Sequence, residues 1–293
     1  MEQGQPTTVI GTAQDAAPHW KPVNGSHAIQ MAYAAVSFSQ PVTSVIWKRI
    51  LATSRDVAFN AGLTLEVPVQ SLMFQIGGPP GQKPPPPSPF TNSGVEFHRQ
   101  EIPGMVNEKL VLAENQIRFE TYAYTRWAGF SAAVEALFEA VLPIYFEAVN
   151  LSSIALEYTD VFVWSEEGAA DCSEILNLES PFIAFGAAQR SGLWHSHTGW
   201  FDFETLGQRI LANADVTVAD AATPEGTRRV INIRTHESSQ FLASGDGSLI
   251  DLDVGQKSIV PILNKHHDTL KIRLHDMLTE SGRDLISLGS PDA

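Results

Sequence analysis

Residues 116–164 read QIRFETYAYTRWAGFSAAVEALFEAVLPIYFEAVNLSSIALEYTDVFVW, and this stretch decides the fold class. The segment 116–124 alternates apolar and polar side chains, which predicts a strand. A turn at 127–129 leads to a long helix over 131–149, whose apolar residues recur at helical spacing. Residues 153–164 predict the next strand. The stretch therefore indicates a strand–helix–strand unit with the helix lying across a sheet.

The chain before this unit adds further elements of the same kind. Residues 31–38 predict a strand, and Gln40-Pro41 is expected to open a helix, because proline suits the first helical turn. Residues 63–76 alternate like extended chain but include Pro68, which cannot donate a ladder hydrogen bond. This segment is therefore expected to be an edge strand at best.

Residues 77–94 contain GGPPGQKPPPPSP. Consecutive prolines favour the polyproline II conformation and cannot join a sheet. The segment predicts a projecting loop, which is either a stiff solvent-exposed insertion or a docking motif for a partner.

The second half of the chain repeats this pattern loosely. The expected elements are a strand over 192–204, a short helix over 205–212, extended chain over 229–242, a turn at 243–248, a return strand over 249–254 and a closing helix over 258–281. Gly282 is expected to end that helix.

These elements predict an α+β fold, with a mixed or antiparallel sheet, helices packed on one face and two loosely similar halves. The expected organisation is a flexible N-terminal arm over residues 1–28, a first α+β half over 29–165 and a second half over 166–293.

Composition excludes several classes of protein. The net charge is −14 and no basic stripe is present, which argues against direct nucleic-acid binding. Cys172 is the single cysteine, so disulfides and cysteine-rich zinc sites are excluded and a reducing compartment is expected. No signal peptide and no apolar stretch of roughly 20 residues is found, which indicates a cytoplasmic protein without membrane contact.

The chain carries no nucleotide-binding loop and no familiar hydrolase motif, so we predict no cofactor and leave catalysis undecided, leaning against it. Histidines offer one alternative. His195 and His197 lie two apart on a predicted strand and so share a face, and His267 of the last helix could add a third metal ligand. The competing interpretation is that they are packed, hydrogen-bonded histidines. His266, in an apolar stripe, is expected to be a core histidine satisfied by a backbone carbonyl, and the alternative is a pH-sensitive interface or another buried hydrogen bond.

Aromatic and arginine side chains offer a second candidate site, for a ligand or a protein partner. Tyrosine, tryptophan and arginine together are typical of binding hot spots, and also of a seam between domains. The candidate residues are Tyr124, Arg126, Trp127, Tyr158, Trp194 and Trp200.

Three segments, AVSFSQPV (35–42), YAYTRWAGF (122–130) and LEYTDVF (156–162), resemble a sporadically distributed, functionally uncharacterised bacterial protein family of about this length. The resemblance covers mainly residues 30–165. It implies a bacterial accessory protein and carries no activity with it. Glu157 and Thr159-Asp160 depart from the polar residues that the family pattern places around the tyrosine.

The sequence therefore predicts a bacterial, intracellular accessory protein that acts as a non-catalytic protein-interaction or regulatory component. The alternative is a metal-dependent enzyme that uses the histidines. We expect a protein partner or self-association, with a homodimer formed by the closing helix or by its neighbouring edge strand at 229–242.

Overall fold

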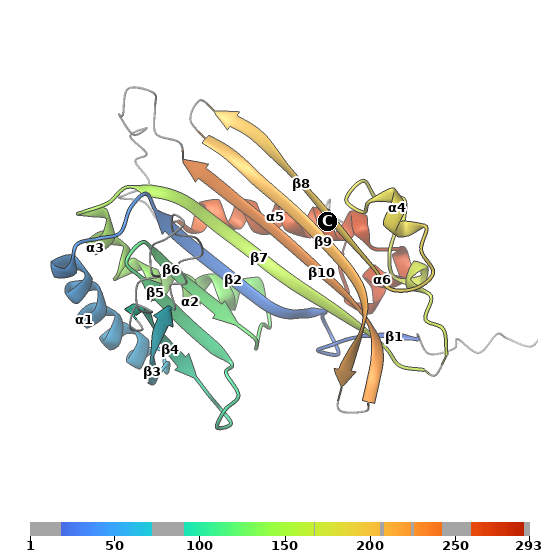
Figure 1. Ribbon diagram of the computed structural model, residues 1–293, viewed down its shortest axis with the longest axis horizontal. Helices are drawn as coiled ribbons and strands as arrows, with labels where there is room; N and C mark the ends of the chain where they lie inside the picture. Colours follow the sequence, from blue (N-terminus) through green and yellow to red (C-terminus); the bar gives the residue numbers. More distant parts are fainter. Residues whose placement is uncertain are drawn as a thin grey trace, which may run out of the picture.

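The computed structural model describes residues 19–71, 91–166, 168–205, 208–223, 226–241 and 259–289 (Figure 1). The strands are β1 (Trp20–Pro22), β2 (Ile29–Phe38), β3 (Leu65–Ser71), β4 (Thr91–Arg99), β5 (Glu108–Ala113), β6 (Gln116–Thr121), β7 (Leu151–Trp164), β8 (Trp194–Thr205), β9 (Gln208–Thr223) and β10 (Gly226–Phe241). The helices are α1 (Ser44–Asn60), α2 (Trp127–Glu139), α3 (Leu142–Phe146), α4 (Phe185–Ala188), α5 (Val260–Met277) and α6 (Glu280–Leu285), with a 3₁₀ turn at Cys172–Glu174.

The strands form one antiparallel sheet in the order β3-β4-β5-β6-β2-β7-β10-β9-β8, and β1 pairs with the far end of β7. Helices and a large antiparallel sheet agree with the predicted α+β class. The strand–helix–strand unit is present as β6–α2–α3–β7, with β2 between its two strands. Because β2 is antiparallel to both neighbours, β6 and β7 run parallel to each other.

Two departures from the predicted helices occur near prolines, and a proline explains the first of them. The helix expected over 131–149 is two helices, since α2 ends at Glu139 and α3 begins at Leu142. Pro143 has no N–H to bond to the carbonyl of Glu139, so α2 cannot continue through it. Pro41 does not open α1, which begins at Ser44 after Thr43.

The short helix expected over 205–212 is wrong, because this segment enters β9. Buried residues of β9 recur at every second position, at Ile210, Ala212, Ala214, Val216 and Val218. That period belongs to a strand, and eight residues were too few to distinguish it from a helix turn.

The expected edge strands have different outcomes. β3 is the edge strand that Pro68 predicted, and the remainder of that segment lies outside the described residues. The segment 229–242 is not an edge, because β10 lies between β7 and β9. The predicted proline-rich loop falls largely on residues that are not described, although β4 already begins at Thr91 within it. The predicted turn and return strand over 243–254 also lie outside the described residues.

The closing helix ends earlier than predicted. α5 stops at Met277, Leu278 is extended, and α6 begins after Thr279, whose hydroxyl accepts a hydrogen bond from the N–H of Gly282. Gly282 is therefore inside a helix. A Cβ at this position would lie 2.7 Å from the carbonyl oxygen of Ile175, so glycine permits a close approach rather than ending the helix.

The core consists of two clusters of buried side chains on one continuous sheet. The first joins β2, β4–β7 and α1–α3 with the beginning of α5. The second joins β1, α4 and α6 with the far ends of β7, β9, β10 and α5. α5 contacts both β7 and β10 and so spans the two clusters (Figure 1). β7 pairs with strands of both predicted halves, so the sheet runs unbroken across the expected boundary at residue 165.

Candidate functional site

Buried polar side chains lie where the two core clusters meet. On β7, Tyr158 belongs to the first cluster and Phe162 to the second, and Asp160 stands between them on the same face. We call this group the polar seam. Its members are Tyr124, Tyr158, Asp160, Thr235, Glu237, Ser239, His266, His267 and Arg273.

One end of the seam brings together sequence-predicted residues from three elements. The Trp127 ring of α2 stacks on His267 of α5 at 4.4 Å between centroids, and its Nε1 donates to Asn264 at 2.8 Å. The hydroxyl of Tyr158 lies 3.0 Å from His267 Nδ1. The Tyr124 ring packs edge-on against Tyr158 at 5.8 Å. Burial lowers the pKa of His267 and raises that of Tyr158, so both groups are neutral at neutral pH.

Among the members of the polar seam, the carboxyl group of Asp160 has the least compensation for its burial. It is 1% exposed, and its Oδ1 has no hydrogen-bond partner in the structure. Burial raises its pKa to about 7, because a carboxylate loses its hydration there without gaining a cation. A buried carboxyl with a raised pKa is typical of functional sites and also of strained structural ones.

The other end of the seam is an ion-paired network. Glu237 of β10 lies 2.9 Å from His266 Nδ1 and accepts a bond of 2.8 Å from Arg273 Nη2. The N–H of Ser239 donates to His266 Nε2 at 3.3 Å. Burial would raise the pKa of Glu237, but His266 and Arg273 outweigh it and the pKa is lowered. His266 is a core histidine, as predicted, but its partners are the carboxylate of Glu237 and Ser239 in place of the expected backbone carbonyl.

The remaining sequence-predicted aromatics and arginine lie apart from Tyr124, Trp127 and Tyr158. Trp200 of β8 stacks on Phe182 at 5.4 Å, and the guanidinium of Arg273 lies 4.9 Å from the Trp200 ring centre. Trp194 is buried in the second cluster. Arg126 is exposed immediately before α2. The six residues thus occupy several places instead of one surface, and the close packing of Tyr124 and Tyr158 leaves little surface for a ligand.

The histidines proposed as metal ligands have separate partners. His195 lies 3.3 Å from the hydroxyl of Thr217, and His197 pairs with Asp215. Both are on the outer face of β8, whereas His267 packs in the seam. Among the described residues, no group of three or more histidine, cysteine or acidic side chains is arranged to hold a metal ion. The metal hypothesis stays a prediction without an assembled site.

A polar sheet face, missed in the sequence analysis, lies opposite the core. Glu157 and Tyr33 are register partners, and Glu157 also pairs with His236. The Tyr33 hydroxyl donates to Glu157 at 3.2 Å, and His236 Nδ1 lies 3.3 Å from the same carboxylate. Arg234 lies two residues before His236 on the same face of β10, and it pairs with Asp215 of β9. Asp215 also pairs with His197, and these two partners hold the pKa of Asp215 low against the effect of burial. The alternation of Arg234 with His236 was the sequence signal for this face.

The two edges of the sheet differ in how they are protected. Edge strand β3 carries Pro68, and its Glu66 is paired with Arg55 of α1 at 2.7 Å. β8, at the other end, has 12 residues and pairs with β9 alone among the described strands. It contains neither proline nor lysine, the residues that usually protect an edge.

Exposed apolar side chains accompany the open edge of β8. Phe203 is 77% exposed and Phe201 is 49% exposed, and Leu193 immediately before the strand is 58% exposed. All three lie on the same face by alternation. Large apolar side chains beside an unpaired strand edge are typical of a site at which another strand is added.

No protein-family model and no curated protein matches this chain. The resemblance to an uncharacterised bacterial family therefore stays a prediction. Within the described residues, no helix combines the length and the apolar character needed to cross a membrane.

Proposed function

We propose that this chain is a non-catalytic protein-interaction component that binds through β8, and that its first partner is a second copy of itself. The observation that carries the proposal is the unprotected edge of β8 beside Phe201 and Phe203. Strand addition at such an edge supplies main-chain hydrogen bonds, and the flanking side chains supply specificity. A bacterial, cytoplasmic accessory role is part of the proposal and is supported by the sequence resemblance.

Charge supports a second copy as the occupant. An antiparallel pair of β8 strands centred on Gly199 is isologous, since each residue meets its counterpart on the twofold-related strand. Phe201 would then lie opposite the partner's His197, and Phe203 opposite the partner's His195. The acid Asp202 of β8 would face the partner's Ser196. No two acids oppose each other in this register, which matters for a chain of net charge −14.

The proposal also includes the polar sheet face. We take the helices to cover one face of the sheet and the ion-paired face around Glu157 to meet solvent. A sheet extended by β8 pairing would then continue that polar face across both copies. We also propose that the two halves of the chain are loosely similar. The division of the core into two clusters supports this.

The experiment compares the chain with the variant Phe201→Lys, Phe203→Lys. Lysine on an edge strand blocks pairing, and each new ammonium would face a histidine of the partner. Light scattering at micromolar concentration should give twice the 31.9 kDa chain mass for the wild type and the single chain mass for the variant. Phe59→Lys is the control, since the exposure of Phe59, 68%, lies between those of Phe201 and Phe203, but Phe59 lies on α1.

Two outcomes would overturn the proposal. A wild-type chain that is monomeric throughout this concentration range has no self-association to explain. A dimer that persists in the folded lysine variant, with folding checked by circular dichroism, has its interface away from β8.

A further inference from the structure

A cavity of about 740 Å³ is lined by residues of β1, β7, β9 and β10. These strands meet at the end of the sheet where β1 pairs with β7, next to the β9–β10 hairpin (Figure 1). Cavities that bind small molecules usually have volumes of roughly 300–1,000 Å³. This one is independent of the β8 edge, because its lining comes from β1, β7, β9 and β10 and the residues beside them.

The floor of the cavity is apolar. Val161 and Val163 of β7 lie on one face of the strand by alternation, and Val230 of β10 is the register partner of Val163. Asn232, the register partner of Val161, adds an amide at one side of the floor. The buried Trp164 also contributes to the lining. An apolar floor with few polar groups is the usual composition of a small-molecule site.

Among the described residues, the charged side chains of the lining are both cations. They are Lys21 of β1 and Arg228 of β10, although the chain has 33 acids against 19 lysines and arginines. Neither cation forms an ion pair within the described part of the chain. Arg228 Nη1 donates to the backbone carbonyl of Glu166 at 3.4 Å, whereas the Glu166 carboxylate lies 3.8 Å from His19.

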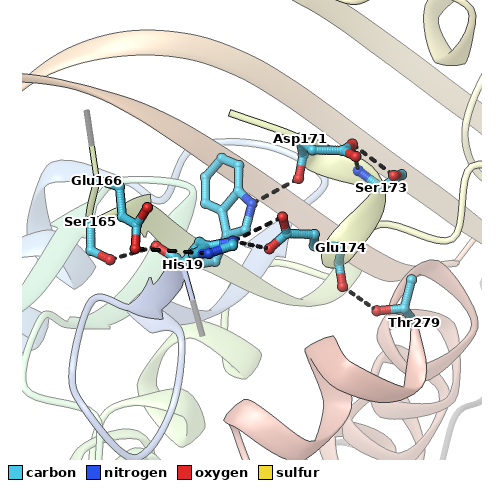
Figure 2. Close-up of polar contacts among 8 residues, drawn as sticks. His19, Ser165, Glu166, Asp171, Ser173, Glu174 and Thr279 are labelled. Carbon is cyan, nitrogen blue, oxygen red and sulfur yellow. Dashed lines mark hydrogen bonds and ion pairs between the residues drawn. The ribbon is translucent and has the colours of Figure 1, made fainter. Parts of the chain in front are cut away.

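The wall formed by β1 is held in place before any ligand binds. Ser165 donates to the carbonyl of His19 at 2.7 Å, and His19 Nδ1 lies 3.1 Å from Glu174 (Figure 2). Trp20 is fully buried, and its Nε1 donates to the carbonyl of Asp171 at 2.9 Å. The N–H of Val23 donates to Val161 at 3.0 Å. A wall fixed in this way loses little conformational entropy on binding, which favours affinity.

We propose that this cavity binds an organic anion with an apolar body, such as a medium-chain carboxylate. The apolar chain lies over Val161, Val163 and Val230, and the carboxylate is placed between Lys21 and Arg228. Arginine suits the head group because its planar guanidinium matches a carboxylate with two parallel hydrogen bonds. Two cations with no acid beside them among the described lining residues favour anions over neutral molecules.

The probes are octanoate and its neutral counterpart octan-1-ol, titrated into the full chain by calorimetry, with tryptophan fluorescence as a second readout. We expect octanoate to bind in preference to octan-1-ol. The variant Lys21→Gln, Arg228→Gln should bind octanoate about tenfold more weakly or worse, because it loses charge-assisted hydrogen bonds to the carboxylate. Arg229→Gln is the matched control, since it removes the neighbouring cation, which pairs with Asp220 and does not line the cavity.

Absence of octanoate binding at millimolar concentration would overturn the proposal. Equal binding of octanoate and octan-1-ol would also overturn it, as would unchanged affinity in the double variant, because then the two cations do not select the ligand. Light scattering of the same variants separates this result from self-association through β8.

Discussion

Replacing Asp160 by asparagine should change how the stability of this protein depends on pH. Asp160 is enclosed by the polar seam, and burial raises its pKa to about 7. Asparagine has nearly the shape of the protonated acid but cannot ionise. The substitution therefore removes one titration and leaves the packing around Tyr124 and Tyr158 in place.

The magnitude follows from the two pKa values. The usual pKa of an aspartate is 3.8, so the folded state raises it by about three units, and each unit corresponds to about 1.36 kcal/mol. The folded chain keeps a proton that the unfolded chain releases, so the free energy of unfolding falls as pH rises from 4 to 7. The total is about 4 kcal/mol, of which more than half falls between pH 5 and pH 8.

His267 contributes in the opposite direction. Its lowered pKa means that the unfolded chain takes up a proton near pH 6.5 that the folded chain does not, so its contribution to stability rises with pH. The wild-type slope alone therefore mixes two titrations. The difference between the wild type and Asp160→Asn isolates the carboxyl group.

Urea unfolding at pH 5 and at pH 8, followed by tryptophan fluorescence, measures this difference. Relative to Asp160→Asn, the wild type should lose roughly 2–3 kcal/mol between the two pH values. Asp56→Asn, at an exposed position on α1, is the control and should follow the wild type. Parallel pH profiles for the wild type and Asp160→Asn would refute the raised pKa.

Three further predictions concern the seam, the first core cluster and the metal hypothesis. Glu237→Gln should lower the free energy of unfolding by ~3–5 kcal/mol, because it leaves the buried charge of Arg273 uncompensated. Adding Arg273→Met should restore more than half of that loss. The midpoints of urea unfolding, at constant slope, measure the stability of the single and the double variant. Tyr145→Phe should cost ~0.5–1.5 kcal/mol, since its hydroxyl donates to the carbonyl of Ala113 at 2.6 Å and phenylalanine removes that hydrogen bond; a loss below 0.5 kcal/mol would contradict this. Elemental analysis of protein made without a histidine tag should find less than about a tenth of an equivalent of transition metal, whereas one equivalent would revive the histidine-centred enzyme.

Part of the candidate site could be predicted from the sequence, because patterns that span only a few residues position some of its side chains. The strand-to-helix segment placed Tyr124 and Trp127 close together, and the following strand supplied Tyr158. The contact of Trp127 and Tyr158 with His267 could not be predicted, because His267 lies 109 positions after Tyr158. Alternation along a strand tells which side chains share a face, but it does not tell which helix covers that face.

The edge of the sheet shows the same division. Pro68 fixed β3 as an edge strand from sequence alone, since proline cannot pair on both sides. Nothing local distinguished β8 from β10, because both are long, alternating strands without proline. Only the tertiary pairing of β10 with β7 and β9 left β8 at the edge of the described sheet, with Phe201 and Phe203 beside it.

The sequence by itself determined the α+β class, the strand–helix–strand unit of β6, α2, α3 and β7, the acidic character and the lone cysteine. These properties depend on composition and on periods of a few residues. The tertiary structure alone decided that β2 separates β6 from β7, that Asp160 is buried between two core clusters, and that Lys21 and Arg228 share one cavity. Each of these depends on which distant strands pair and in which register, and pairing energy depends on the whole buried surface rather than on any local segment.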